Sequence, residues 1–462
     1  MPLKARSLFI FRRDLRLADN SGLLVALERY PSVLPVFVLD PRQLGPHPFR
    51  SGPGLAFMAE SLMDLDTQLE TVGARLHLFF GVPEKIIPRL AQKHRFEAVF
   101  TNRDYTPFAV ARDAALADSL ARRNIAFHSF ADCLLNEPEL VLQGDQSPYT
   151  VFAPFFKRVR FYPIDLPRPN SHENYYHKEL PGEIPVASLS KLAQTYANAS
   201  APSGGRRNAL VVLEKIPSRT RQVRESDGLF LSATTGLSPH LKFGTISVRE
   251  AYHAIAKKLG TTGALSRNLY WRDFFTHIGY HFPRVFSGAF QTRLDFIAWE
   301  NDPEKFAAWC EGRTGFPLVD AGMRELNATG YLPHRLRMVV ASFLNHDLHI
   351  DWRWGEKFFA TRLVDYDPCA NNGNWQWVAS SGCDGPFCFR FFNPWLQQEK
   401  WDPACAYIHK WIRELGGLEP SEIHRMKEVR PMHLVGYPVP IVDHGERSKQ
   451  TRRLFAKARA GA

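Results

Sequence analysis

Ser7-Leu8-Phe9-Ile10-Phe11 is an unbroken apolar run, and Val33–Leu39 (VLPVFVL) is a second one. Three more such runs follow at 76–80, 98–101 and 125–130, separated by amphipathic patterns near 20–30, 54–72, 83–94 and 107–123. Strands that are apolar throughout and alternate with helices are typical of a parallel sheet covered on both faces. We therefore expect residues 1–132 to form a doubly wound α/β domain, with a ligand site at the carboxyl ends of its strands.

The rest of the chain has a different pattern. Residues 165–205 are rich in proline, serine and asparagine, so we expect an interdomain linker over 133–205 with one short helix at 186–198. Helical periodicity then dominates, and we expect residues 206–462 to form an all-α domain. The expected helices are 248–259, 264–281, 303–312, 317–329, 334–348, 355–363 and 368–379.

The amino-acid composition limits the classes of protein to which this chain can belong. Lys and Arg exceed Asp and Glu by 11 in 462 residues without any block of like charge, so a polyanionic partner would bind a folded patch; a merely solvated surface would have the same excess. We expect no membrane segment and no signal peptide, and hence a cytoplasmic or nuclear protein that is not secreted. Six cysteines do not form a disulfide framework. All ten tryptophans lie at or after Trp271.

The densest polar segment is residues 365–377 (DYDPCANNGNWQW). Asp367 followed by Pro368 predicts a capped helix start. Asn371 and Trp375 then fall on one helical face. A carboxylate, an amide and an indole on one stripe could surround a flat heteroaromatic ligand with polar edges, whereas the alternative is a capped helix with buried tryptophans.

This segment resembles the flavin-binding signature of the photolyase/cryptochrome family, and the similarity extends over nearly the whole chain. Four other motifs resemble the family's in the same order, and their spacing is that of the class I branch, which repairs cyclobutane pyrimidine dimers. They are residues 11–20 (FRRDLRLADN), 269–275 (LYWRDFF), 389–394 (FRFFNP) and 398–403 (QEKWDP). The resemblance implies a photolyase-like fold, in which an α/β domain precedes an all-α FAD-binding domain.

The resemblance also implies a cofactor site. The phosphate-binding loop matches Thr234, Thr235, Gly236, Leu237 and Ser238, where Gly236 replaces the family's usual arginine. The other implied FAD contacts are Arg337, Asp365, Tyr366, Asp367 and Asn371, and Asn371 occupies the position that faces flavin N5. A second, antenna chromophore would bind the N-terminal domain. Phe108-Ala109 replaces the Asn-Glu pair of folate-binding members, and residues 102–107 resemble members with a deazaflavin or a second flavin.

The implied catalytic set contains Asn371, the electron relay Trp375, Trp352 and Trp299, and the pocket residues Asn268 and His334. The residues implied to bind the lesion or DNA are Asn268, Trp271, Arg272, His334, Arg335, Met338, Trp377 and Arg390. Dimer-repairing members usually have Glu at position 268 and Asn at position 334. Repair of cyclobutane dimers in UV-damaged DNA is the leading hypothesis; a cryptochrome-like photoreceptor and a (6-4) photolyase are the alternatives.

Two further expectations concern partners and metals. We expect a monomer that binds no metal ion. The cysteines Cys369, Cys383, Cys388 and Cys405 contain no Cys-x-x-Cys spacing, so we interpret them as buried thiols rather than ligands of zinc or an iron–sulfur cluster.

Overall fold

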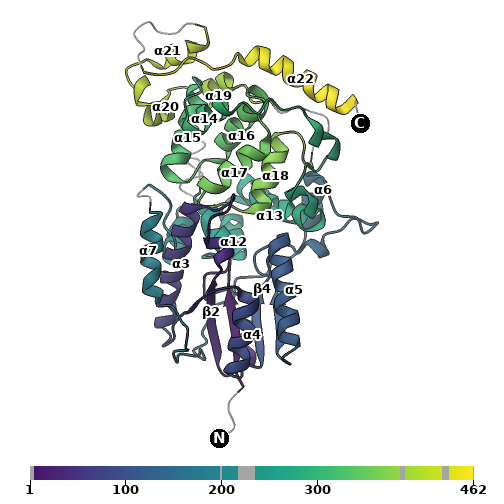
Figure 1. Ribbon diagram of the computed structural model, residues 1–462, viewed down its shortest axis with the longest axis vertical. Helices are drawn as coiled ribbons and strands as arrows, with labels where there is room; N and C mark the ends of the chain where they lie inside the picture. Colours follow the sequence, from purple (N-terminus) through teal and green to yellow (C-terminus); the bar gives the residue numbers. More distant parts are fainter. Residues whose placement is uncertain (1–4, 198–199, 217–234, 385–390, 429–435, 461–462) are drawn as a thin grey trace.

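The computed structural model describes residues 5–197, 200–216, 235–384, 391–428 and 436–460. Its N-terminal part contains a parallel five-stranded sheet in the order β3-β2-β1-β4-β5. In Figure 1 this sheet lies below the helical half of the molecule, with its strands β2 and β4 labelled. The strands are β1 Ser7–Phe11, β2 Val33–Leu39, β3 His77–Phe80, β4 Ala98–Asn102 and β5 Ala126–Phe130. The predicted runs therefore form strands to within one residue at each end, and the doubly wound α/β architecture is confirmed.

Helices cover both faces of this sheet because successive side chains of a strand point to opposite faces. Phe9 and Phe11 of β1 pack with apolar residues of α1 and α3, whereas Leu8 and Ile10 pack with α4 and α5. The helices of this part are α1 Ser21–Arg29, α2 Pro41–Leu44, α3 Gly52–Glu70, α4 Pro83–Lys93 and α5 Pro107–Ala121.

Residues 133–205 connect the two halves and contain more regular structure than the sequence predicts. The expected helix at 186–198 is a short 3₁₀ turn, Val186–Ser188, followed by α7 (Leu189–Thr195), which packs on α3. An additional helix, α6 (Phe152–Val159), packs against the helical half of the molecule. Its eight residues are too few for a clear helical period, so the sequence pattern did not reveal it.

The C-terminal half is helical, as expected, and its largest core cluster contains Trp309, Trp352, Trp375 and Trp395. Its α-helices are α8 Arg206–Glu214, α11 Leu237–Phe243, α12 Val248–Leu259, α13 Ala264–His281, α14 Pro303–Glu311, α15 Pro317–Thr329, α16 His334–Ser342, α17 Trp352–Arg362, α18 Pro368–Val378, α19 Pro394–Trp401, α20 Ala406–Trp411, α21 Pro420–His424 and α22 His444–Ala460. Short 3₁₀ turns lie at Pro138–Leu140, Pro283–Phe286, Thr292–Phe296, Arg413–Leu415 and Arg425–Lys427.

Two of these helices differ from the expected boundaries by more than one residue. The expected helix 334–348 becomes α16 and a π-helical turn, Phe343–Asp347. Helix α17 begins three residues earlier than expected, because the side chain of Asp351 accepts a hydrogen bond from the Arg353 amide and so caps the helix. Among the described residues, no helix is long and apolar enough to cross a membrane.

Candidate functional site

A cavity of about 540 Å³ lies in the helical half, with walls from α11, α13, α16 and α18. It brings together most of the side chains that the sequence singles out, although they are distributed over 143 positions of the chain, from 235 to 377. Its lining includes Thr235, Leu237, Ser238, Asn268, Trp271, Arg272, His334, Arg335, Arg337, Met338, Asp365, Asp367 and Trp377. An adjoining hollow shares part of this wall and adds Tyr366, Asn371 and Trp375.

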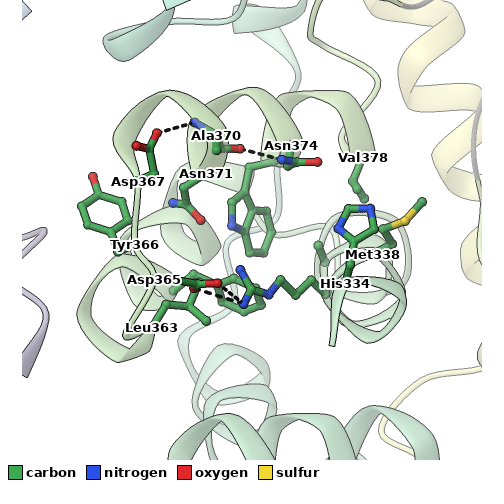
Figure 2. A pocket seen from close by; sticks show the side chains of 14 residues that line it. His334, Met338, Leu363, Asp365, Tyr366, Asp367, Ala370, Asn371, Asn374 and Val378 are labelled. Carbon is green, nitrogen blue, oxygen red and sulfur yellow. Dashed lines mark hydrogen bonds and ion pairs between the residues drawn. The ribbon is translucent and has the colours of Figure 1, made fainter. Parts of the chain in front are cut away.

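The start of α18 supplies the polar end of this hollow (Figure 2). The carboxylate of Asp367 accepts a hydrogen bond from the Ala370 amide at 3.0 Å, which confirms the predicted cap. Asn371 lies one turn further on and donates to the backbone carbonyl of Glu356 at 3.1 Å. Asp365, Tyr366, Asp367 and Asn371 gather at one end, and His334 and Met338 lie at the other.

The charge of Asp367 is fixed by cations from outside its helix. Arg13, the second residue after β1, forms an ion pair with Asp367 and also lies 3.0 Å from Asp104. Burial alone would raise the pKa of Asp367, but Arg13 and Lys242 outweigh burial and hold it well below its usual range. Asp367 is therefore an anion at every physiological pH.

Arg337 on α16 and Asp365, three residues before α18, form a second ion pair. The guanidinium lies 2.8 and 3.1 Å from the two carboxylate oxygens, and its Nε donates to the Leu332 carbonyl at 2.7 Å. This fixed pair presents both a donor and an acceptor edge to the cavity. A flat ring with polar edges matches such a wall.

The expected phosphate loop precedes α11, although Thr234 lies outside the described residues. Thr235 and Ser238 line the cavity, and the Thr235 hydroxyl accepts a hydrogen bond from the Leu237 amide at 3.4 Å. Gly236 has φ of 71°, a left-handed conformation that glycine adopts without strain. The residue that replaces the family's arginine therefore suits the turn.

Lys242 supplies a cation that the sequence patterns missed. It lies on the cavity wall one helical turn after Ser238, and this i, i+4 spacing was the signal that could have revealed it. Burial and the nearby Arg13 lower the pKa of Lys242 to about 8. A charged ammonium beside hydroxyls and a glycine turn suits a diphosphate, so the residues present fit a dinucleotide such as FAD.

Aromatic walls bound the wide part of the cavity. The indole of Trp271 is stacked on Phe152 of α6, with ring centroids 3.7 Å apart and planes 9° apart. Trp377 lies on α18 and donates its indole N–H to Asp384 at 3.3 Å. Both rings are half-buried and line the cavity, the place that the family resemblance implies for them. Flat, partly exposed aromatic surfaces can stack on nucleobases.

The two atypical residues face the same cavity. Asn268 is exposed on α13, and His334, at the start of α16, is exposed to the open cavity although protein surrounds it. The surrounding protein, with Arg337 and Arg335, lowers the pKa of His334 to about 4, so its imidazole is neutral at physiological pH. Met338 lies one turn after His334 and shares the wall.

The three expected DNA-contacting arginines differ in their surroundings. Arg272 is half-buried and donates to the carbonyl of Cys133, so part of its hydrogen-bonding capacity serves the connecting segment. Arg335 lies over the ring of Trp401, 5.2 Å from its centroid, and lines the cavity. Arg390 lies outside the described residues.

The three relay tryptophans lie on separate elements and differ in exposure. Trp375 on α18 and Trp352 at the start of α17 are each 2% exposed, whereas Trp299 is half-buried and contacts Phe455 of α22. Helix α17 approaches Trp375 so closely that a Cβ on Gly355 would lie 2.2 Å from the indole. The order from buried to partly exposed is the one a relay between cofactor and surface requires.

The carboxyl edge of the sheet contains a separate group of arginines. Arg42 and Arg112 lie over the Phe108 ring, 4.9 and 5.8 Å from its centroid. Within the described part of the chain, the Nη2 atoms of Arg12 and Arg112 are buried without a hydrogen-bond partner. Buried guanidinium donors are normally satisfied, so this edge suits an anionic ligand.

The cysteines that the structure describes are free thiols. Cys369, Cys383 and Cys405 are buried free thiols, as expected, and Cys388 lies outside the described residues. Burial raises the pKa of the Cys405 thiol to about 12. Among the described residues, no three or more His, Cys, Asp or Glu side chains cluster so that they could hold a metal ion.

Comparisons with known proteins agree with this geometry. Residues 7–170 match the DNA photolyase family model, and residues 265–457 match that of the FAD binding domain of DNA photolyase. A deoxyribodipyrimidine photo-lyase of Synechococcus sp. is 36% identical over 99% of this chain and 98% of its own length.

Two solved structures are similar over the whole chain. An archaeal photolyase from Sulfolobus tokodaii, solved with two FAD molecules, shares 41% identity and a TM-score of 0.87 over 98% of this chain and all of that one. A bacterial class III photolyase from Agrobacterium tumefaciens shares 34% identity and a TM-score of 0.90 over 100% and 99% of the two chains. The chain therefore belongs to the DNA photolyase family of deoxyribodipyrimidine photo-lyases and carries that family's FAD-binding domain.

Proposed function

We propose that this protein repairs UV-damaged DNA by light-driven splitting of cyclobutane pyrimidine dimers. The observation that carries the proposal is one continuous cavity. Its wall contains the groups suited to a dinucleotide (Ser238, Lys242 and Asp365) together with the aromatic rings suited to displaced bases (Trp271 and Trp377). A cofactor and a flipped-out lesion in one cavity would be close enough for direct electron transfer.

The protein's own residues hold and orient the cofactor. Ser238 and Lys242 would bind its phosphates, and the Arg337–Asp365 pair with Asn371 would fix the ring. When bound and reduced, FAD supplies the light-excited electron that opens the dimer. Because the electron returns after splitting, the reaction has no net redox change. Trp375 is 2% exposed and lines the same hollow as Asn371, so its indole would shield the bound ring from water.

The wide part of the cavity would receive the lesion. Extrusion is least costly for damaged bases, and each base stacked on an aromatic ring contributes roughly 1–3 kcal/mol. Trp271 and Trp377 would form the two stacking walls. The Asn268 amide can donate a hydrogen bond to a dimer carbonyl, and neutral His334 can donate one N–H at the opposite side. Arg335 would contact the phosphate backbone without sequence preference.

Trp375, Trp352 and Trp299 would reduce the flavin in light, by hopping of an electron inward from the surface. A second chromophore of deazaflavin or flavin type would bind at the sheet edge, where the orphaned guanidinium nitrogens of Arg12 and Arg112 suit an anionic group. The solved relative from Sulfolobus tokodaii contains two FAD molecules, which supports the flavin option.

The test uses oligonucleotides that each carry one defined lesion. Reduced protein is illuminated with a cyclobutane dimer or a (6-4) photoproduct, and restored bases are measured by chromatography. We expect repair of the cyclobutane dimer alone. Repair of the (6-4) lesion alone would favour His334 as part of a different pocket, and failure on both by protein with bound, photoreducible FAD would favour a photoreceptor.

Asn268→Glu provides the matched variant. It introduces the carboxyl group that dimer-repairing members usually have at this position, and such a group can donate a stronger hydrogen bond to the dimer radical anion. We expect the yield of dimer repair per absorbed photon to increase. A variant with unchanged yield would show that Asn268 does not face the dimer.

A further inference from the structure

Asp384 lies between the two aromatic walls of the cavity without lining it. One carboxylate oxygen accepts the indole N–H of Trp377 at 3.3 Å. The other accepts the backbone N–H of Phe152 at 2.7 Å. Its own amide donates to the Thr150 carbonyl at 2.9 Å. A single half-buried side chain thus joins the segment after α18 to the start of α6, across 232 positions of sequence.

Through its hydrogen bond to Phe152, Asp384 also acts on the cavity wall that Trp271 forms. Phe152 is the first residue of α6, whose preceding residue Val151 offers no side-chain cap, so the carboxylate of Asp384 caps this helix from another segment. The Phe152 ring is 2% exposed and is stacked face to face on Trp271. Fixing the start of α6 therefore fixes the surface against which Trp271 rests.

The backbone conformation of Asp384 also indicates a specific connection to residues 150–152. Its φ is 62°, in the left-handed region that few residues other than glycine adopt, and aspartate tolerates it better than most. This conformation turns the chain so that the amide and the carboxylate both face the 150–152 segment. Strained backbone persists only where surrounding contacts determine it.

We propose that Asp384 is a positioning residue that sets the separation and tilt of Trp271 and Trp377, and hence the fit of the flipped-out lesion. The inference rests on the proposed lesion-binding role of these two rings. A pyrimidine dimer of fixed dimensions must fit against both rings, so small displacements of one wall reduce stacking. Asp384 acts on that fit through Trp377 directly and through Phe152 indirectly.

The test variant is Asp384→Asn. An amide keeps the shape, but its NH₂ group must face either the Phe152 N–H or the Trp377 indole N–H, and that donor loses its acceptor. We expect the Kd for an oligonucleotide with one thymine dimer to increase about tenfold, with unchanged Kd for undamaged DNA. The flavin absorption spectrum and its photoreduction rate should stay unchanged, which a general loss of structure would not allow.

A double-mutant cycle tests whether Asp384 affects lesion binding through its hydrogen bond to Trp377. Trp377→Phe removes the indole donor, so Asp384→Asn should cost less lesion affinity in that background, by about threefold rather than tenfold. The matched control is Asp66→Ala, because Asp66 is also half-buried and accepts a backbone N–H, that of Leu76 at 2.7 Å, within the N-terminal half. We expect lesion affinity to be unaffected in the control.

Each possible result supports or contradicts either the positioning role of Asp384 or the proposed function. If wild-type protein binds the dimer and Asp384→Asn binds it equally well, or the cycle is additive, the positioning role is wrong while the proposed function stands. If wild-type protein binds no lesion, the proposed function itself fails. If Asp384→Asn does not retain flavin, Phe152→Leu takes its place: loss of the preference for damaged DNA supports the role, and an unchanged preference overturns it.

Discussion

At the scale of single residues, His334 separates the candidate reactions most sharply. Because the surrounding protein, with Arg337 and Arg335, lowers its pKa to about 4, it gains a proton only as the pH falls through that value. We predict that dimer repair by reduced protein is independent of pH between 6 and 8, and that His334→Asn has the same flat profile. Repair yields over this range test it. A sigmoidal loss of repair near pH 7, absent from His334→Asn, would mean that protonated His334 takes part.

Gly355 is the residue on which the position of Trp375 depends. A methyl group there would meet the indole at 2.2 Å and the Leu344 side chain at 2.6 Å. Although alanine favours helices, overpacking outweighs that gain, and we predict that Gly355→Ala lowers the free energy of unfolding by about 1–3 kcal/mol. It should also slow flavin photoreduction, which absorption spectroscopy follows. Gly417→Ala, where a Cβ meets open space, is the control and should change neither.

At the scale of elements, the contact between α17 and α18 contains a titratable group. Glu356 on α17 is 7% exposed and accepts a hydrogen bond from Asn372 on α18 at 2.9 Å, and burial raises its pKa to about 7. Its folded-state pKa thus exceeds the unfolded value of about 4.3, so stability falls as the pH rises between these values. We predict that Glu356→Gln flattens this dependence and stabilises the protein by up to about 3 kcal/mol at pH 8.

Denaturant unfolding at pH 5 and pH 8 measures this effect. The difference between the two pH values should be smaller in Glu356→Gln than in the wild type. Glu304→Gln, on the exposed first turn of α14, is the control and should keep the wild-type difference. An equal pH dependence in Glu356→Gln and wild type would show that Glu356 is ionised in the folded protein.

At the scale of the whole molecule, the sequence predicts what is local and misses what is not. Apolar runs locate the strands, and i, i+3 and i, i+4 spacing places Asn268 with Trp271, and His334 with Met338, on shared faces. The prediction that these two faces belong to one site came from the similarity to a known family. The contact between Asp384 and Phe152 spans 232 positions, and no periodic pattern encodes such a pair.

The ion pair between Arg13 and Asp367 spans 354 positions and connects the sheet edge to the helix that carries Asn371. Removing Arg13 would leave Asp367 and Asp104 buried without their main cation, which typically costs about 3–5 kcal/mol. We predict that Arg13→Gln lowers the free energy of unfolding by about this amount and weakens flavin retention on gel filtration. Because burial would then raise the pKa of Asp367, its ionisation would no longer add stability above the unfolded-state pKa of about 3.9, so the loss of stability on acidification should be smaller than in the wild type.

Arg206→Gln is the matched control for this last prediction. Its ion pair with Glu250 is buried to the same degree, with both side chains 14% exposed against 18% and 14% for Arg13 and Asp367, but it joins α8 to α12 away from the cavity wall. Both variants should lose stability, yet only Arg13→Gln should lose flavin. Equal flavin retention in the two would mean that the Arg13 pair holds the two halves together without shaping the cofactor site.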